Sequence, residues 1–236
     1  MFDKSLQYSV AAQKRQRHRL LRIVFTALAI LLVYNAASAF LISAWVVQGD
    51  SMQPNFRSGD RLLVLSSAIP SLLSGSDIPH ARGSVVLVDK SRVGGRNPFA
   101  VAADALIRFV TAQRVGLPGR EGVRMKRIVA LPGDEVTMSG FVMRIRPAGT
   151  PFALTEFELA DRPYDADIPQ LPAIWGSGLP FSGVMPPVAL AAGEIFVVSD
   201  DRASTDDSRS WGPVDSGAVV GRPVFRFWPP SRIGFP

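Results

Sequence analysis

The pattern of apolar and polar residues divides the chain into an uncharged apolar run near its start and a series of short apolar segments after it. Residues Ile23 to Val47 include no charged side chain, and at 1.5 Å per residue a helix of this length would cross a hydrocarbon core about 30 Å thick. The later segments are rich in Val and Ile and are separated by Gly, Pro, Asn and Asp, which is typical of β-strands. We therefore predict strands at Arg61–Leu65, Ser84–Val88, Arg124–Leu131, Glu135–Met138, Phe141–Arg146, Glu194–Val198 and Val219–Phe227.

Two stretches interrupt this rhythm. Residues 91–120 contain a candidate short helix at Pro98–Val110, and residues 147–190 are dense in proline and glycine. We interpret both as insertions or long loops on the β scaffold. The predicted fold class is mainly β, with one N-terminal transmembrane helix followed by a β-sheet-rich domain that carries long loop insertions.

Basic residues lie directly before the apolar run, and they predict its orientation. A cleavable secretory signal is the alternative, but its apolar region is usually only about 7–15 residues long. The positive-inside rule places a basic flank in the cytoplasm. We expect a cytoplasmic tail at 1–22, a single-pass anchor in the cytoplasmic (inner) membrane at 23–47, and a domain on its outer face at 48–236; the basic residues are Lys14, Arg15, Arg17, Arg19 and Arg22.

Composition and charge narrow the classes of partner. The 236 residues allow one sizeable domain, and the net charge of +6 first suggests a nucleic-acid partner. Outside the N-terminal tail, however, the basic residues form no helical stripe with interleaved aromatic residues. Attraction of the tail to anionic membrane lipid is the simpler interpretation, and we expect no nucleic-acid partner.

The scarcity of cysteine and histidine limits the chemistry further. The chain contains no cysteine, which excludes thiol nucleophiles, disulfides and thiolate metal sites. Its two histidines are His18, in the predicted tail, and His80, in a predicted loop. We therefore expect no metal and no cofactor, and a histidine-based triad would depend on His80 alone.

Two residues are candidates for nucleophilic catalysis. Ser51 lies in Gly49-Asp50-Ser51-Met52-Gln53-Pro54, and by composition alone this segment is an ordinary turn. Lys126 begins the apolar segment that ends in Leu-Pro-Gly-Asp. Lysine is seldom buried, so Lys126 either flanks its strand in solvent or has a function inside.

Base catalysis would be such a function. A serine hydroxyl needs a neighbouring group to take its proton, and desolvation can lower a lysine pKa from about 10.4 towards neutrality. A serine with a lysine is a known alternative to the histidine triad.

These segments resemble the type I signal peptidase (leader peptidase) family of serine/lysine endopeptidases. The boxes of that family are Ser-Met-x-Pro, Arg-Gly-Asp-Val-Val, Lys-Arg-x-x-x-Leu-Pro-Gly-Asp and Gly-Asp-Asn-Arg-x-x-Ser-x-Asp-Ser-Arg. This chain has, in the same order, Ser51-Met52-Gln53-Pro54, Arg82-Gly83-Ser84-Val85-Val86, Lys126 through Asp134, and Ser199 through Arg209. The resemblance extends from the apolar run to Phe227-Trp228-Pro229-Pro230.

The resemblance implies a role for each matching residue. Ser51 would be the nucleophile, with its backbone N–H facing the oxyanion, and Lys126 would be the general base. Thr205 would orient the lysine amine. Structural roles near the site would fall to Asp207, Arg209 and Arg127, and shallow apolar substrate pockets would be lined by Val47, Met52, Phe56 and Met125. The substrate, a preprotein bearing a signal peptide, would lie extended between strand edges near 46–51 and 123–126.

The chain also departs from the family boxes. Gly49 stands where some relatives have a serine that donates a second oxyanion hydrogen bond, and Ser199 replaces a glycine near the lysine. Ser84, Asn55 and Asp201 are further substitutions. Three alternatives therefore stay open: a conjugation-type peptidase that matures a pilin or another dedicated substrate, a self-cleaving repressor of the SOS type, and an inactive membrane-anchored binding protein. The apolar run and the lack of a DNA-binding segment argue against the repressor.

Overall fold

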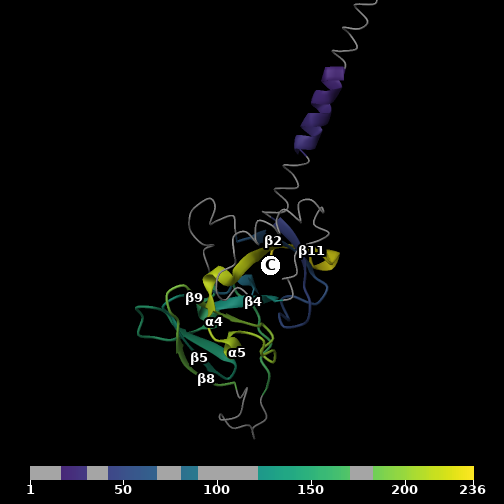
Figure 1. The fold of residues 1–236 in the computed structure, drawn as a ribbon. Coiled ribbons are helices and arrows are strands. Elements are labelled where there is room, and N and C mark those ends of the chain that lie inside the picture. The colour runs from purple at the N-terminus through teal and green to yellow at the C-terminus, as the bar shows by residue number, and fades with distance from the viewer. Residues whose placement is uncertain (1–16, 31–41, 68–80, 90–121, 171–182) are drawn as a thin grey trace, which may run out of the picture.

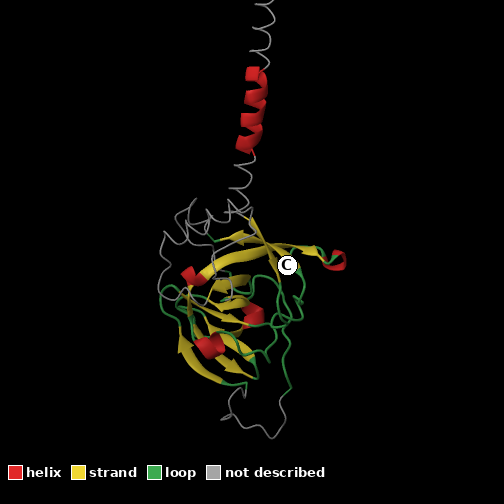
Figure 2. Cartoon of the chain, turned by 45° about the vertical axis from the view of Figure 1, so that its right-hand side comes forward, coloured by secondary structure: helices red, strands yellow, loops and turns green. Residues whose placement is uncertain are grey.

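The computed structural model describes residues 17–30, 42–67, 81–89, 122–170 and 183–236. The predicted helix at Pro98–Val110 and the histidine His80 lie outside these residues. Figure 2 shows that strands dominate the described part of the chain. The predicted mainly β fold class is therefore confirmed.

A seven-stranded antiparallel sheet has the order β1-β2-β11-β3-β4-β9-β10. Figure 1 shows its β2 and β11 at the opposite end of the β domain from β5 and β8. The strands of the sheet are β1 (Ile42–Val46), β2 (Arg61–Ser66), β3 (Val85–Asp89), β4 (Val123–Ala130), β9 (Glu194–Val198), β10 (Val214–Asp215) and β11 (Val219–Trp228).

A second, four-stranded antiparallel sheet has the order β7-β6-β5-β8. It contains β5 (Glu135–Ser139), β6 (Val142–Arg146), β7 (Leu154–Thr155) and β8 (Met185–Ala189). Short helices complete the domain: α4 (Glu156–Leu159), α5 (Ser208–Trp211), and the 3-10 turns η2 (Ser216–Ala218) and η3 (Pro230–Arg232). All seven strands predicted from the sequence are present, with ends that differ by no more than a residue or two.

The apolar run predicted as one helix contains two kinds of structure. Residues 17–30 are helical, but Ile42–Val46 forms β1 and pairs with β2 from Ile42↔Leu65 to Val46↔Arg61. The prediction of a helix through Val47 is therefore wrong at its C-terminal end, because an uninterrupted apolar run conceals the alternation of a half-buried strand. In the described part of the chain, no helix is both long and apolar enough to cross a membrane. Residues 31–41 lie outside that part.

Residues 147–190 were predicted to be loop, and this is wrong where β7, α4 and β8 form. Residues 171–182 of this stretch lie outside the described residues. β8 has the sequence Met-Pro-Pro-Val-Ala and is an edge strand. Proline cannot donate a ladder hydrogen bond, so it is tolerated on an edge. The edge position explains how a proline-rich segment forms a strand.

β4 organises the core, because its side chains contribute to three buried clusters. Val123 and Met125 belong to a cluster with residues of β2 and of the turn that follows β1. Val129 and Ala130 belong to a cluster with residues of the second sheet. Ile128 belongs to a third cluster, with residues of β3 and β9. Lys126 lies between these contributions on the same strand. The strand that carries the lysine is therefore fixed by core packing before and after Lys126.

Candidate active site

Lys126 is buried in the middle of the seven-stranded sheet, with a relative exposure of 1%. It pairs with Val86 of β3. On its other side β4 pairs with β9 at Arg127↔Val198, and the next step of this antiparallel register brings Lys126 opposite Ser199. The Lys126 Nζ donates a hydrogen bond of 2.9 Å to the Ser199 Oγ. The alternative that Lys126 flanks its strand in solvent is therefore wrong.

Burial determines the electrostatics of this lysine. Desolvation lowers the pKa of Lys126 below its ordinary value, and the negative charges of Asp207 and Asp206 offset only part of that effect. The Trp211 ring lies with its centroid 6.0 Å from the Nζ. An amine in this setting loses its proton more readily than an exposed lysine, which is the property that a general base requires.

Ser51 lies in a compact turn that follows β1. The Gln53 N–H donates to the Asp50 carbonyl, and the Phe56 N–H donates to the Met52 carbonyl. Ser51 itself is half-buried, and its carbonyl accepts a 3.1 Å hydrogen bond from the Asp201 N–H. This bond ties the turn to the segment that starts at Ser199. Within the described residues, no hydrogen bond joins the Ser51 hydroxyl to the Lys126 amine.

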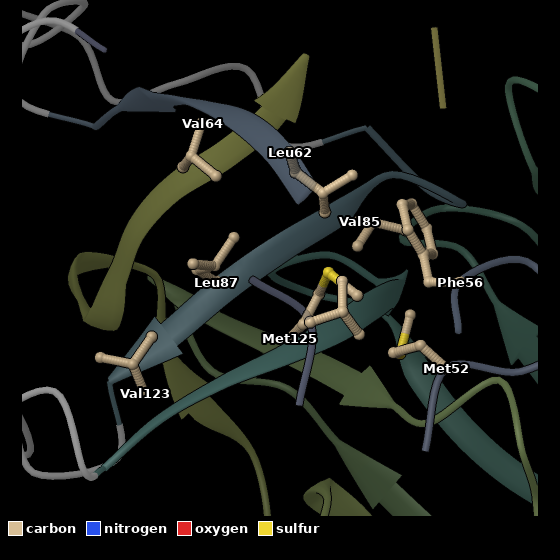
Figure 3. Packing of buried hydrophobic residues seen from close by; sticks show 9 residues of the cluster. Met52, Phe56, Leu62, Val64, Val85, Leu87, Val123 and Met125 are labelled. Carbon is tan, nitrogen blue, oxygen red and sulfur yellow. The ribbon is translucent and has the colours of Figure 1, made fainter. Parts of the chain in front are cut away.

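The four residues predicted to line substrate pockets lie together beneath this turn. Val47, Met52, Phe56 and Met125 belong to one buried cluster, and each is at most 7% exposed. Figure 3 shows Met52, Phe56 and Met125 within this cluster. Met52 and Phe56 thus anchor the Ser51 turn against β4. Whether they also contact a substrate stays a prediction.

A second polar link joins the same turn to the strand of the lysine. Asn55 donates a 2.8 Å hydrogen bond to Asp200, and Arg127 binds the same carboxylate with two hydrogen bonds of 2.6 Å. The Arg127 guanidinium also lies 3.9 Å from the centroid of the Tyr164 ring. Arg127 and Asp200 are 5% and 0% exposed. Their pairing satisfies two charges that would be costly to bury alone.

The predicted charged pair of Asp207 and Arg209 is present as a 2.7 Å ion pair. Burial would raise the pKa of Asp207, but the hydrogen bonds and charge of Arg209 outweigh burial and hold it below its usual value. Asp207 also accepts a 2.9 Å hydrogen bond from the Ser199 N–H. The ionised Asp207 therefore fixes the backbone of the residue that contacts Lys126.

Thr205 is half-buried in the same segment. Its carbonyl accepts from the Ser210 hydroxyl at 2.6 Å. In the described residues, the Thr205 hydroxyl makes no hydrogen bond with Lys126, and Ser199 contacts the amine instead. An orienting role for Thr205 therefore stays a prediction.

An ion pair between Arg82 and Asp134 joins the second of the four boxes to the end of the third. The guanidinium donates to both carboxylate oxygens over 2.8–3.1 Å, and the Leu131 N–H donates to Asp134 at 2.8 Å. This pair fixes the turn at the end of β4 against the segment before β3.

The sequence did not reveal a buried cluster beside Arg127. Glu156 accepts hydrogen bonds from the Tyr164 hydroxyl and the Arg202 guanidinium. Burial and the charge of Glu156 raise the pKa of Tyr164. The one sign of this cluster in the sequence is that Arg202 lies in the last family box. Its partners come from residues 147–190, where no element was predicted. Among the described residues, no group of three or more His, Cys, Asp or Glu side chains could hold a metal ion.

Comparisons with known proteins match the chain over most of its length. A family model described as "Signal peptidase, peptidase S26" matches residues 17–228. Signal peptidase I of Leptolyngbya laminosa is 25% identical over 195 residues, which cover 83% of this chain and 73% of that protein. Signal peptidase IB of Staphylococcus aureus (strain MRSA252) is 22% identical over 218 residues, covering 90% of this chain and 91% of that protein.

A plant relative is more similar over a shorter segment. Thylakoidal processing peptidase 1, chloroplastic, of Arabidopsis thaliana is 44% identical over 54 residues. The match covers 23% of this chain and 16% of the Arabidopsis protein. This likeness is therefore confined to a small part of both proteins.

Proposed function

The chain belongs to the S26 family of signal peptidases, and we propose that it is a membrane-bound serine endopeptidase that removes signal peptides from preproteins, with Ser51 as nucleophile and Lys126 as general base. The observation that carries the assignment of the base is the burial of Lys126, which is 1% exposed and whose pKa is lowered by desolvation. The turn that holds Ser51 is joined to the strand of Lys126 through Asn55, Asp200 and Arg127.

Acylation would use these two side chains in turn. The Ser51 Oγ attacks the carbonyl carbon of the peptide bond while the neutral Lys126 amine takes the hydroxyl proton. The tetrahedral intermediate then collapses, the C–N bond breaks, and the lysine ammonium returns the proton to the leaving amine. The N-terminal fragment stays on Ser51 as an ester.

Deacylation would repeat the sequence with water as the nucleophile. Lys126 takes a proton from the water as its oxygen attacks the ester carbonyl. Collapse of the second intermediate breaks the bond to the Ser51 Oγ and returns the proton to that oxygen. These proton transfers and bond changes require neither a metal ion nor a redox cofactor.

The Ser51 backbone N–H is our candidate donor to the oxyanion. It has no backbone partner among the described residues, so it can donate to a substrate oxygen. Gly49 has a φ of +77°, a conformation that disfavours any side chain. A serine at this position would be strained, and the glycine is consistent with the local backbone. We therefore expect the second hydrogen-bond donor to the oxyanion to be a residue other than Gly49.

Open strand edges support the proposed extended binding of substrate. β1 is at the edge of its sheet, and β4 pairs with β9 only from Arg127 onwards. Val47 and Met125 share one core cluster, so the two edges belong to the same region of the domain. A peptide could pair with either edge by β-augmentation.

We propose that the N-terminal apolar residues anchor the enzyme in the cytoplasmic membrane by a single crossing. Residues 17–30 are helical and begin with basic side chains, whereas β1 begins at Ile42. The proposed anchor therefore ends before Ile42 and not at Val47. The basic flank would contact anionic lipid on the cytoplasmic side, and the β domain would act on the outer face.

Cleavage by the full chain in detergent tests this function. A preprotein with a small residue before the cut site and a pilin precursor are incubated separately with wild type, Ser51→Ala and Lys126→Ala, and the fragments are measured by mass spectrometry. We expect wild type to cut and both variants to lose at least about 100-fold in rate. The proposal fails if either variant, folded by circular dichroism, cuts at the wild-type rate, or if wild type cuts neither substrate. Cutting of the pilin precursor alone would indicate a dedicated substrate.

A further inference from the structure

Ser199 occupies an unusual position for a polar side chain. It lies immediately after β9, has 0% relative exposure, and is opposite Lys126 in the sheet register. The matching family box has glycine here, so this hydroxyl is a feature of the present chain. A buried hydroxyl is costly unless it is hydrogen-bonded.

The hydroxyl has partners on both sides. Its oxygen accepts the 2.9 Å hydrogen bond from the Lys126 Nζ, and the hydroxyl is directed towards the Ser204 Oγ at a long 3.5 Å. The backbone N–H of Ser199 is held at 2.9 Å by Asp207, which is ion-paired with Arg209. The contact with Asp207 therefore fixes the position of Ser199 independently of its hydrogen bond to the amine.

We propose that Ser199 is a positioning residue for the general base of this enzyme, a role that rests on the proposed function of Lys126. A neutral amine has two N–H bonds and one lone pair. With one N–H committed to the Ser199 Oγ, the lone pair is confined to the remaining tetrahedral directions. The hydroxyl thereby reduces the orientations from which the amine can accept the Ser51 proton.

The same contact biases the protonation of Lys126. A hydroxyl oxygen stabilises an ammonium more than a neutral amine, because hydrogen bonds to charged donors are stronger. Loss of the hydroxyl should therefore lower the pKa of Lys126 further. The other charged groups that act on this amine are Asp207, Asp206, Arg124 and Arg209, and none is altered by a change at Ser199.

A lysine titration measures this effect without substrate. The lysines of the full chain are Lys4, Lys14, Lys90 and Lys126, so a spectrum of ¹³Cε-labelled lysine in detergent is simple, and Lys126→Met assigns the signal. In Ser199→Ala we expect the Lys126 pKa to fall by about one unit, the shift expected for one charged hydrogen bond. Ser199→Thr, which retains a hydroxyl, should return the pKa towards the wild-type value.

The matched control is another buried serine in the same segment. Ser208 is 2% exposed, and its Oγ accepts from the Val197 N–H at 3.1 Å, away from the amine. Ser208→Ala should leave the Lys126 pKa and the pH profile at their wild-type values. A general loss of packing would affect both alanine variants alike.

Cleavage kinetics supply the second measurement. Ser199→Ala should lower kcat roughly 10-fold with KM unchanged, and the acidic limb of its pH profile should move to lower pH together with the lysine pKa. An unchanged pKa and an unchanged kcat in folded Ser199→Ala overturn this inference, while a wild type that still depends on Ser51 and Lys126 keeps the proposed function intact. Full activity of Lys126→Ala would overturn both.

Discussion

The Arg127 guanidinium donates two hydrogen bonds to the Asp200 carboxylate, Nε to Oδ1 and Nη2 to Oδ2, each 2.6 Å long. These residues directly follow Lys126 and Ser199, which form their own hydrogen bond. Two successive cross-strand contacts therefore fasten β4 to the end of β9. The first is a buried ion pair, and the second holds the proposed base.

Breaking the buried ion pair should strongly destabilise the fold. Arg127→Ala leaves Asp200 buried without its cation, and Asp200→Ala leaves the guanidinium without its anion, so each should lower the free energy of unfolding by about 3–5 kcal/mol. Chemical denaturation of both single variants and the double variant gives the coupling energy. Strictly additive losses would contradict the pairing seen here.

Replacement of Gly83 by alanine should lower the free energy of unfolding substantially. Its φ is +84°, and a Cβ there would lie 2.8 Å from the Ala160 Cβ and 3.3 Å from the Ala160 Cα. Gly59 is the matched control, because its φ is +90° but a Cβ would meet no atom within 4 Å. Gly59→Ala should cost about 1–2 kcal/mol of unfolding free energy from backbone conformation alone.

Gly83→Ala carries the same conformational cost and adds the steric overlap, which contributes roughly another 1–3 kcal/mol. Equilibrium denaturation compares the two variants. Equal losses would show that the approach of residue 160 to Gly83 does not constrain the position.

Much of this architecture follows from local sequence pattern. Short apolar or alternating segments with turn residues between them predict both β4, which carries Lys126, and β9, which leads to Ser199. β1 was hidden because its five residues continue an apolar run, and β8 because Pro186 and Pro187 normally exclude a strand. Both strands are fixed by pairing with distant segments, which a local pattern does not contain.

The sequence supplies candidate residues for the site but not the contacts between them. Ser51 and Lys126 lie in recognisable boxes, yet the partner of the lysine depends on the register between β4 and β9. The sequence alone indicates that Ser199, in place of a glycine near the lysine, could alter the pocket or the pKa of Lys126, but not which atom it contacts. The register places its hydroxyl at the amine, whereas Thr205, six residues further along the chain, makes no such contact in the described structure.

Removal of the lysine charge should stabilise the protein. The folded-state pKa of Lys126 lies below its unfolded value, so between these two values the unfolded chain binds more protons. The free energy of unfolding of wild type therefore rises as the pH increases from the folded-state pKa to the unfolded-state pKa. The cost of burying the charged amine is largest at pH values below the folded-state pKa. Lys126→Met should gain on the order of 1 kcal/mol at neutral pH, and the gain should shrink as pH rises towards 10.5.

Urea denaturation of the full chain at several pH values measures this gain. Arg57→Met is the control, because Arg57 is exposed and its removal relieves no desolvation. A Lys126→Met variant that is less stable than wild type at every pH would show that the buried amine stabilises the fold.

The reactivity of a single introduced thiol tests the pairing of Ser51 with Lys126 most directly. The natural chain contains no cysteine, so Ser51→Cys carries one thiol at the position of the proposed nucleophile. Its alkylation rate is measured across pH with Lys126 present and in the double variant with Lys126→Met. If the amine adjoins residue 51, it takes the thiol proton and alkylation near pH 7 is about tenfold faster with Lys126 than without it. Superimposable rate–pH curves for the two proteins would contradict the Ser51–Lys126 pair.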